Sequence, residues 1–177
     1  MMDLSPMSHE PMRPPAPFRL LAGSIIGALI LNLLPWSGAL LRAHPDFVLL
    51  VLLYWGVHQP RSVGQGWGFL LGLVMDVADS VLLGQHALVY VISIYLAQLL
   101  RLRILQLSLL EQALHIGAIL FLAQAMVILL NLSLGREFPG MLLALSPVLA
   151  AVLWPPMDFV ATLPRFRRAP THTTVMR

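Results

Sequence analysis

Two carboxylates, Asp76 and Asp79, lie in a stretch that is otherwise apolar enough to cross a membrane, "GQGWGFLLGLVMDVADSVLLGQHAL" at residues 64–88. A charged side chain is costly in hydrocarbon, so an aspartate inside a membrane span is by default a candidate for function. Two neighbouring carboxylates suggest three kinds of chemistry: acid–base catalysis as in intramembrane aspartyl proteases, a proton relay, or a metal site.

The spacing of the acidic residues argues against catalysis. Facing carboxylates usually come from different helices, whereas Asp76 and Asp79 are three residues apart on one predicted helix. Asp158 could supply a second helix, but we expect it near the cytoplasmic end and Asp76 near the outer end. The histidines show no spacing typical of metal ligands, and no Ser-His-Asp order or phosphate-binding loop is present. We therefore predict that the protein is not an enzyme, with no catalytic residue, no metal and no cofactor.

Glycines share a helix ridge with Asp76. Gly64, Gly68, Gly72 and Asp76 are each four residues apart, and Asp79 lies nearly on the same face. Such a ridge lets another backbone approach closely. One hypothesis is packing within the molecule, with Asp76 accepting hydrogen bonds from the ends of neighbouring spans. The other is docking of a partner helix or a ligand. Both hypotheses assign these five residues to a helix-packing or partner-docking site.

The composition indicates an integral membrane protein. Of 177 residues, 58% are hydrophobic and 11% are charged, and the mean hydropathy is +0.82. Soluble domains have about 25% charged residues. The fold class expected is an all-α polytopic helix bundle in the lipid bilayer. All eleven basic residues are arginines at segment ends, so we interpret them as topological anchors, with no nucleic-acid partner. The absence of cysteine excludes disulfides.

Six membrane spans are predicted, at residues 18–34, 45–57, 64–83, 86–100, 112–134 and 141–163. The second is short for a span, which leaves five spans as the alternative. Residues 101–112 suggest a short interfacial helix, and Pro147, Pro155 and Pro156 predict a kink in the last span. Residues 1–17, with five prolines, are expected to be a disordered cytoplasmic tail. Residues 18–163 would form the six-helix domain, and residues 164–177 a basic cytoplasmic tail.

The arginines also predict the topology. Six spans put nine arginines on one side of the membrane: Arg13, Arg19, Arg61, Arg101, Arg103, Arg165, Arg167, Arg168 and Arg177. The other side would hold Arg42 and Arg136. Because positive charge accumulates on the cytoplasmic side, we expect a multi-pass protein of the cell inner membrane with both termini cytoplasmic.

The third predicted span resembles that of the rod shape-determining protein MreD family. The family shows a G-x-x-x-G-L-x-x-D run followed by a loop with Leu-Gly and a small residue before leucine. The matching residues here are Gly68, Gly72, Leu73, Asp76, Leu83, Gly84, Ala87 and Leu88. The stretches "HPDFVLLVLLYW" and "LWPPMDFVATLPRFRR" are similar to the family's second and last spans. The proline-rich amino tail and the Pro155-Pro156 doublet depart from the family pattern, so the roles of the tails stay open.

The resemblance implies a scaffold or regulatory subunit of the cell-wall elongation machinery, which inserts peptidoglycan and maintains rod shape. Its partners would be an MreC-like bitopic protein, MreB, RodA and a class B penicillin-binding protein. The family's fold is similar to the substrate-binding subunits of energy-coupling-factor transporters, whose six helices can enclose a pocket. Two alternatives follow: a small-molecule-binding subunit of a vitamin-type transporter, and an intramembrane enzyme. A transporter subunit should gather more polar and aromatic groups near its outer face than Asp76, Asp79, His86 and Tyr90.

Overall fold

The computed structural model describes residues 17–38, 43–138 and 140–166, without the side chains of 162–166. Within these ranges every regular element is a helix, which confirms the all-α prediction. The elements are α1 (Phe18–Leu33), α3 (Phe47–His58), α4 (Gln65–Ala78), α5 (Gln85–Leu99), α6 (Arg101–Gln106), α7 (Leu109–Ser133), the 3₁₀ turn η1 (Met141–Ala144), α8 (Leu145–Val152) and α9 (Trp154–Phe166). Most of the two predicted tails lies outside the described residues, but the first three residues of the predicted tail 164–177, with Arg165, still belong to α9.

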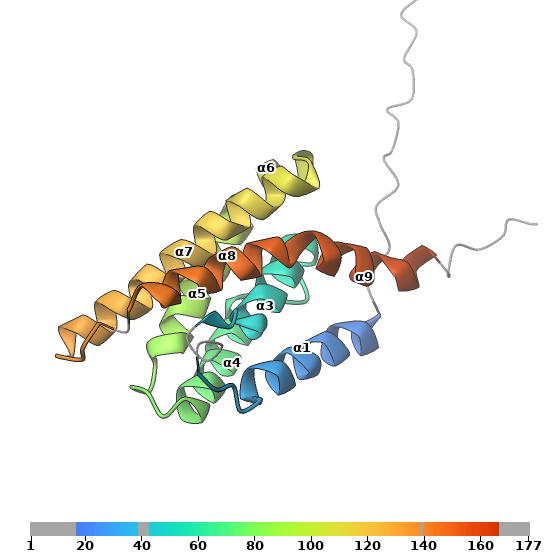
Figure 1. Ribbon diagram of the computed structural model, residues 1–177. Coiled ribbons are helices and arrows are strands. Elements are labelled where there is room, and N and C mark those ends of the chain that lie inside the picture. The colour runs from blue at the N-terminus through green and yellow to red at the C-terminus, as the bar shows by residue number, and fades with distance from the viewer. Residues whose placement is uncertain (1–16, 39–42, 139, 167–177) are drawn as a thin grey trace, which may run out of the picture.

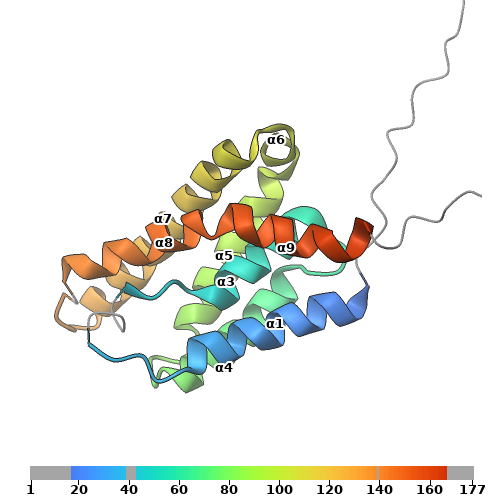
Figure 2. The ribbon, with the colours of Figure 1, turned by 45° about the vertical axis from the view of Figure 1, so that its right-hand side comes forward.

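Helix α3 is the centre of the bundle. It lies between α1 on one side and the α8–α9 pair on the other (Figures 1 and 2). From Val48 to Val57, only Val51 is not fully buried. Around α3, α4 packs along α5, and α7 packs along both α5 and α8. The uniform burial explains why this segment is apolar on all sides, as is typical of a core helix.

Local sequence sets several helix ends. Asp46 caps α3, because its Oδ1 accepts a hydrogen bond from the Leu49 N–H at 3.0 Å. Ser108 and Glu111 form a capping box at the start of α7, with the Ser108 N–H donating to Glu111 Oε2 at 2.9 Å. The predicted interfacial helix at 101–112 therefore ends early, at Gln106, and α7 begins before the predicted residue 112.

The last predicted span is interrupted where its prolines lead one to expect it. The regular helix is interrupted at the single residue Leu153, whose φ and ψ of −77° and −10° stay in the right-handed helical region, and Pro155 and Pro156 lie in the first turn of α9. Pro147 occupies the first turn of α8. Proline is tolerated at these positions because the first N–H groups of a helix have no partner within it.

The third predicted span, 64–83, is too long. Helix α4 ends at Ala78, and residues 79–84 form a turn in which Ser80 and Gly84 have φ values of +52° and +99°. Only glycine enters this left-handed region without steric cost, so Gly84 suits its place just before α5. The side chain of Asp76 holds this turn against α4, as the site below shows.

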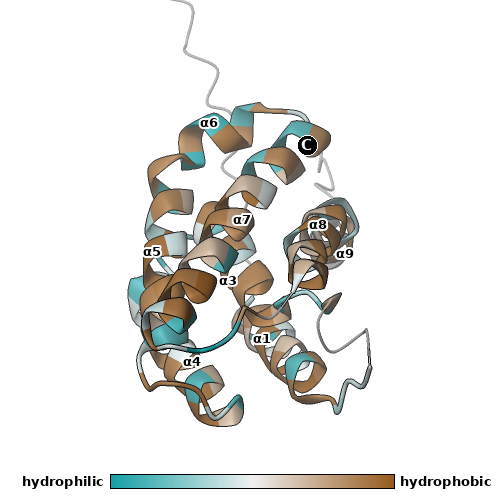
Figure 3. Ribbon diagram, turned by 60° about the vertical axis from the view of Figure 1, so that its left-hand side comes forward, coloured by the Kyte–Doolittle hydropathy of each residue, from teal (hydrophilic) through white to brown (hydrophobic). Residues whose placement is uncertain are grey.

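The outside of the bundle is apolar. Figure 3 shows hydrophobic residues on outward faces of the helices, and the exposed ones include Ile30, Leu114, Leu129 and Val160. Two segments of the described chain are long and apolar enough to cross a bilayer, Leu109–Ser133 and Met141–Ala161. Helices α1, α3, α4 and α5 are apolar but shorter, at 12 to 16 residues. An apolar outer surface, with the few buried polar residues inside the bundle, is typical of a protein surrounded by lipid.

Candidate functional site

Asp76 holds the start of α5. It lies in the last turn of α4 with a fully buried carboxylate. Its Oδ2 accepts a hydrogen bond from the Gly84 N–H at 2.8 Å, and its Oδ1 accepts one from the His86 N–H at 2.7 Å. Because the first N–H groups of a helix lack partners within it and carry partial positive charge, they stabilise a carboxylate there. Asp76 thus caps a neighbouring helix with both oxygens.

His86 completes the hydrogen bonds around Asp76. Its Nδ1 lies 3.0 Å from Asp76 Oδ1, and its Nε2 lies 3.8 Å from Asp79 Oδ2. Each ring nitrogen therefore faces an aspartate, and neither is directed at a separate substrate position. This arrangement binds the α4–α5 turn together through Asp76, Asp79 and His86.

Gly72 and Gly68 lie where α4 meets α5. A Cβ added at Gly72 would lie 2.4 Å from the Cα and 2.5 Å from the backbone nitrogen of Ala87. At Gly68, an added Cβ would lie 2.6 Å from Ile94 Cδ1, the end of a flexible side chain. The closest approach of the two backbones is therefore at Gly72.

The other two predicted residues have more open surroundings. Gly64 precedes α4, and an added Cβ there would meet just one atom, the Pro60 carbonyl oxygen at 4.0 Å. Asp79 follows α4, and its side chain is 48% exposed. Gly68, Gly72 and Asp76 of α4 therefore face α5, whereas Gly64 lies at the opposite end of α4 from Asp76.

A second, partly buried polar cluster joins three helices. Asp46 Oδ2 accepts a hydrogen bond of 2.6 Å from the Tyr90 hydroxyl, and its Oδ1 accepts one of 3.0 Å from the Asn32 amide. Asn32 Oδ1 in turn accepts the Phe47 N–H at 2.9 Å. The cluster ties α1 and α5 to the start of α3. We did not single out Asp46 from the sequence, although an aspartate directly before an apolar run is a helix-start signal.

Asp158 belongs to a different cluster. Its Oδ1 accepts a hydrogen bond of 3.1 Å from the Tyr54 hydroxyl and lies 3.6 Å from His58 Nε2. Asp76 and Asp158 therefore have separate sets of partners, and the structure does not bring them together as a catalytic pair. Within the described residues, no three histidine or acidic side chains are placed to hold a metal ion.

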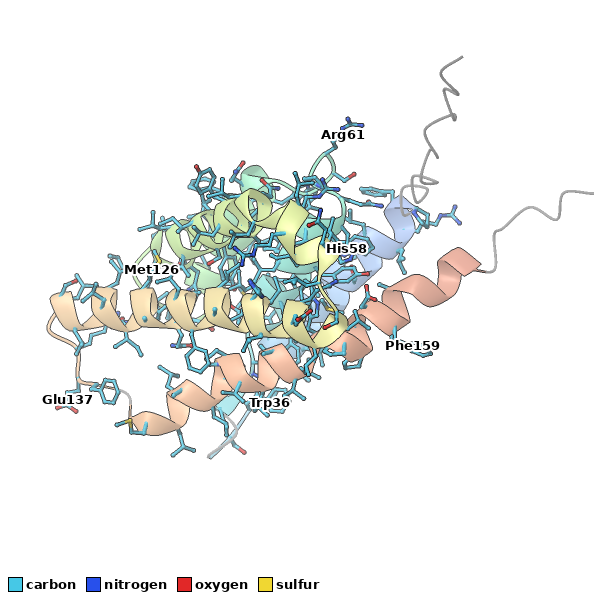
Figure 4. The ribbon with its side chains drawn as sticks, turned by 90° about the horizontal axis from the view of Figure 1, so that it is seen from above. Trp36, His58, Arg61, Met126, Glu137 and Phe159 are labelled. Atoms are coloured by element: carbon cyan, nitrogen blue, oxygen red, sulfur yellow. The ribbon has the colours of Figure 1, made fainter. Side chains whose placement is uncertain are left out.

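A cavity of about 290 Å³ opens beside the Asp46 cluster. Its lining comes from α1, the segment before α3, α3, α4, the α4–α5 turn, α5, α7 and the η1–α8 segment. The polar groups in it are Asn32, His44, Asp46, Asp79, Gln85, His86, Tyr90, Gln124, Asn131 and Ser146. It lies toward the end of the bundle where α7 turns into η1, the end marked by Glu137 in Figure 4. The resemblance allowed for a pocket between the helices, and Asp79, His86 and Tyr90 were considered together from the sequence, but the rest of the lining is scattered from residue 32 to 150.

Comparison with known proteins identifies the family. Residues 16–161 match the family model described as rod shape-determining protein MreD. The chain is 35% identical over 138 residues to the rod shape-determining protein MreD of Haemophilus influenzae, covering 78% of this chain and 85% of that protein. No solved structure matches the chain. The vitamin-type transporter alternative has no support in these matches. Because the family match covers the predicted membrane domain almost end to end, this chain belongs to the MreD family of membrane proteins that determine rod cell shape.

Proposed function

We propose that this protein is a scaffold subunit of the cell-wall elongation machinery in the inner membrane. The observation that carries the proposal is the family match over residues 16–161, which contains all of the helical bundle up to α9. In this proposal the chain crosses the membrane six times with both termini in the cytoplasm, in a layout similar to energy-coupling-factor substrate-binding subunits. The nine-to-two division of arginines supports that topology.

A non-enzymatic role agrees with the way the buried polar groups are used. Asp76 is bonded to N–H groups of the α4–α5 turn, and Asp46 is bonded to Tyr90 and Asn32. Each carboxylate thereby joins helices, which is how a scaffold holds its shape in a medium without water. In the proposal, Gly68, Gly72 and Asp76 serve packing within the molecule. Gly64 and Asp79 border this packed ridge at its two ends.

The proposed partner is an MreC-like protein with a single membrane-spanning helix. An apolar groove of about 360 Å³ lies over α3 between α1 and the α8–α9 segment. Gly27 lines this groove, and added Cβ atoms at Gly23 and Gly27 would meet no atom within 4 Å. A glycine pair four residues apart on an open helix face allows a second membrane helix to approach closely. We infer that the partner's membrane helix docks here, and that MreB, RodA and a class B penicillin-binding protein join through the same complex.

Complementation tests the proposed function. The chain would be expressed in a rod-shaped bacterium whose own MreD-type gene is deleted and whose cells are therefore round. We expect rods to return and the tagged chain to co-purify with the MreC-like protein from detergent-solubilised membranes. The same test is made in the chain's own host. Cells that stay round there, although the protein reaches its normal level in the membrane, would contradict the proposal. Restored rods without partner recovery would contradict the docking part alone.

A further inference from the structure

Three arginines lie at the end of the bundle where α3 ends and α6 begins. Arg61 is in the turn at residues 59–64 between α3 and α4, and Arg101 and Arg103 are in α6. Among the residues that the structure describes, every ion pair joins a histidine to an aspartate, so none of these arginines is paired with a carboxylate. Figure 4 shows Arg61 projecting away from the bundle.

The carboxylates at this end have other partners. Glu111 Oε2 accepts hydrogen bonds from the Ser108 N–H at 2.9 Å and from the Ser108 hydroxyl at 2.8 Å. Asp158 accepts a hydrogen bond from the Tyr54 hydroxyl and lies beside His58. The positive charge of the three arginines is therefore not neutralised within the described part of the chain, and the surface that they form favours an anion.

Hydrogen bonds hold the segments that carry the arginines together. The Arg101 Nε–H donates to the carbonyl oxygen of Val57 at 2.6 Å, so the start of α6 is attached to the last turn of α3. The Gln98 amide donates to the carbonyl oxygen of Val63 at 3.1 Å, so the turn that contains Arg61 is attached to the last turn of α5. The 59–64 turn and α6 therefore form one surface, which we call the arginine surface.

Exposed apolar side chains place the arginine surface at the boundary of the membrane. Leu102, between the two arginines of α6, is 71% exposed, and Leu110, at the start of α7, is 78% exposed. Trp67, in the first turn of α4 at the same end, is also exposed, and tryptophan is enriched at the level of the lipid headgroups. A water-soluble acidic partner would match the charge but not the leucines. Unpaired arginines beside exposed leucines instead suit the region where headgroups meet acyl chains.

We infer that the arginine surface binds an anionic phospholipid, with Arg61, Arg101 and Arg103 as donors to its phosphate and the leucines against its acyl chains. Guanidinium groups match the oxygens of a phosphate in both geometry and charge. A zwitterionic lipid carries its own cation next to the phosphate, so the arginines should favour a lipid with a net negative charge. The inference concerns lipid binding, and it does not depend on the proposed scaffold role or on which side of the membrane this end faces.

Thermal melting of the purified full-length chain tests the inference. In detergent micelles, phosphatidylglycerol, which is anionic, would be titrated against phosphatidylcholine, which has the same phosphate but no net charge. We expect phosphatidylglycerol to raise the melting temperature by a few degrees more than phosphatidylcholine does. Glycerol 3-phosphate, which has a similar headgroup chemistry without acyl chains, should give no rise at equal concentration. A rise as large with glycerol 3-phosphate as with phosphatidylglycerol would contradict the assignment of a lipid.

Variants decide whether the effect belongs to the arginine surface. Arg61→Gln and Arg103→Gln change exposed side chains, and each should raise the phosphatidylglycerol fraction needed for half of the effect by about fivefold. Arg136→Gln removes the same charge from an exposed arginine after α7, at the opposite end of the bundle, and should respond like the parent chain. Each variant is compared with its own melting temperature in phosphatidylcholine, so a change in stability alone cancels. The inference fails if phosphatidylglycerol protects no better than phosphatidylcholine, if Arg61→Gln and Arg103→Gln keep the full response, or if Arg136→Gln loses as much.

Discussion

Asp76 and His86 meet twice, through the backbone N–H of His86 at 2.7 Å and through its ring Nδ1 at 3.0 Å, both on Asp76 Oδ1. The other oxygen of Asp76 accepts the Gly84 N–H. One buried carboxylate thus closes the turn between α4 and α5. Both oxygens of Asp76 are therefore acceptors of backbone N–H groups.

The first prediction follows from this pattern. Asp76→Asn should destabilise the protein, because the amide nitrogen would face an N–H donor and leave it unpaired, at a cost of about 1–3 kcal/mol. Asp76→Leu should be worse, since it leaves every donor without a partner. Melting temperatures in detergent, together with cell shape, show whether stability and function fall in the order parent, Asp76→Asn, Asp76→Leu. Asn and Leu variants with equal loss of function at normal membrane levels would show that the charge itself is required.

The second prediction ranks substitutions along the glycine ridge. Gly72→Ala should be severe, because its Cβ would lie 2.4 Å from the Ala87 Cα and backbone cannot turn aside. Gly68→Ala should be milder, since Ile94 Cδ1 can rotate away. Gly66→Ala meets nothing within 4 Å and should be neutral or stabilising by about 0.5–1 kcal/mol. Membrane level and melting temperature of the three variants check the ranking, and a Gly72→Ala variant as stable as Gly66→Ala would contradict it.

The third prediction concerns the hydrogen bond between Tyr90 and Asp46. The tyrosine is fully buried, and its hydroxyl donates to the carboxylate at 2.6 Å. Tyr90→Phe should lower the free energy of unfolding by about 1.5–3 kcal/mol, the range for a bond to a charged group. Tyr95→Phe, on an exposed tyrosine of the same helix, is the matched control. Equal stability of the two variants would mean that the Tyr90 bond contributes nothing.

The fourth prediction concerns topology. A reporter fused to the carboxyl terminus should be active in the cytoplasm, and one fused after Arg136 should be active in the periplasm. The physical reason is the retention of arginine on the cytoplasmic side during insertion. Accessibility of single cysteines introduced at Arg61 and Glu137 gives an independent check, because the chain has no native cysteine. A periplasmic carboxyl terminus would overturn the six-span arrangement.

The fifth prediction tests the groove over α3. Gly27→Leu fills a site where an added Cβ meets no atom of the chain, so the bundle should stay folded while the partner helix is blocked. Recovery of the MreC-like protein should fall, and cells should become rounder. Gly66→Leu adds the same side chain at another open position away from the groove and should retain the partner. Full recovery with Gly27→Leu would place the docking surface elsewhere.

Local features of the chain were sufficient to predict the membrane class, the helical fold and most helix positions. Composition alone separates a lipid-facing bundle from a soluble domain, and Pro155 and Pro156 mark the interruption at Leu153 because proline acts on its own turn. The four-residue spacing of Gly68, Gly72 and Asp76 predicted a shared face, because helix geometry is periodic. The end of α4 was misplaced, since apolar residues continue through the turn at 79–84.

Only the tertiary structure decided what that face contacts. It packs on α5, the next helix in the chain, and Asp76 binds the N–H groups at its start. Asn32, Asp46 and Tyr90 meet through hydrogen bonds between residues 14 and 44 positions apart. The cavity that Gln85 lines is likewise built from residues scattered along the chain. Sequence periodicity specifies which side of a helix is apolar, but the choice of neighbour depends on how all the helices fill space together.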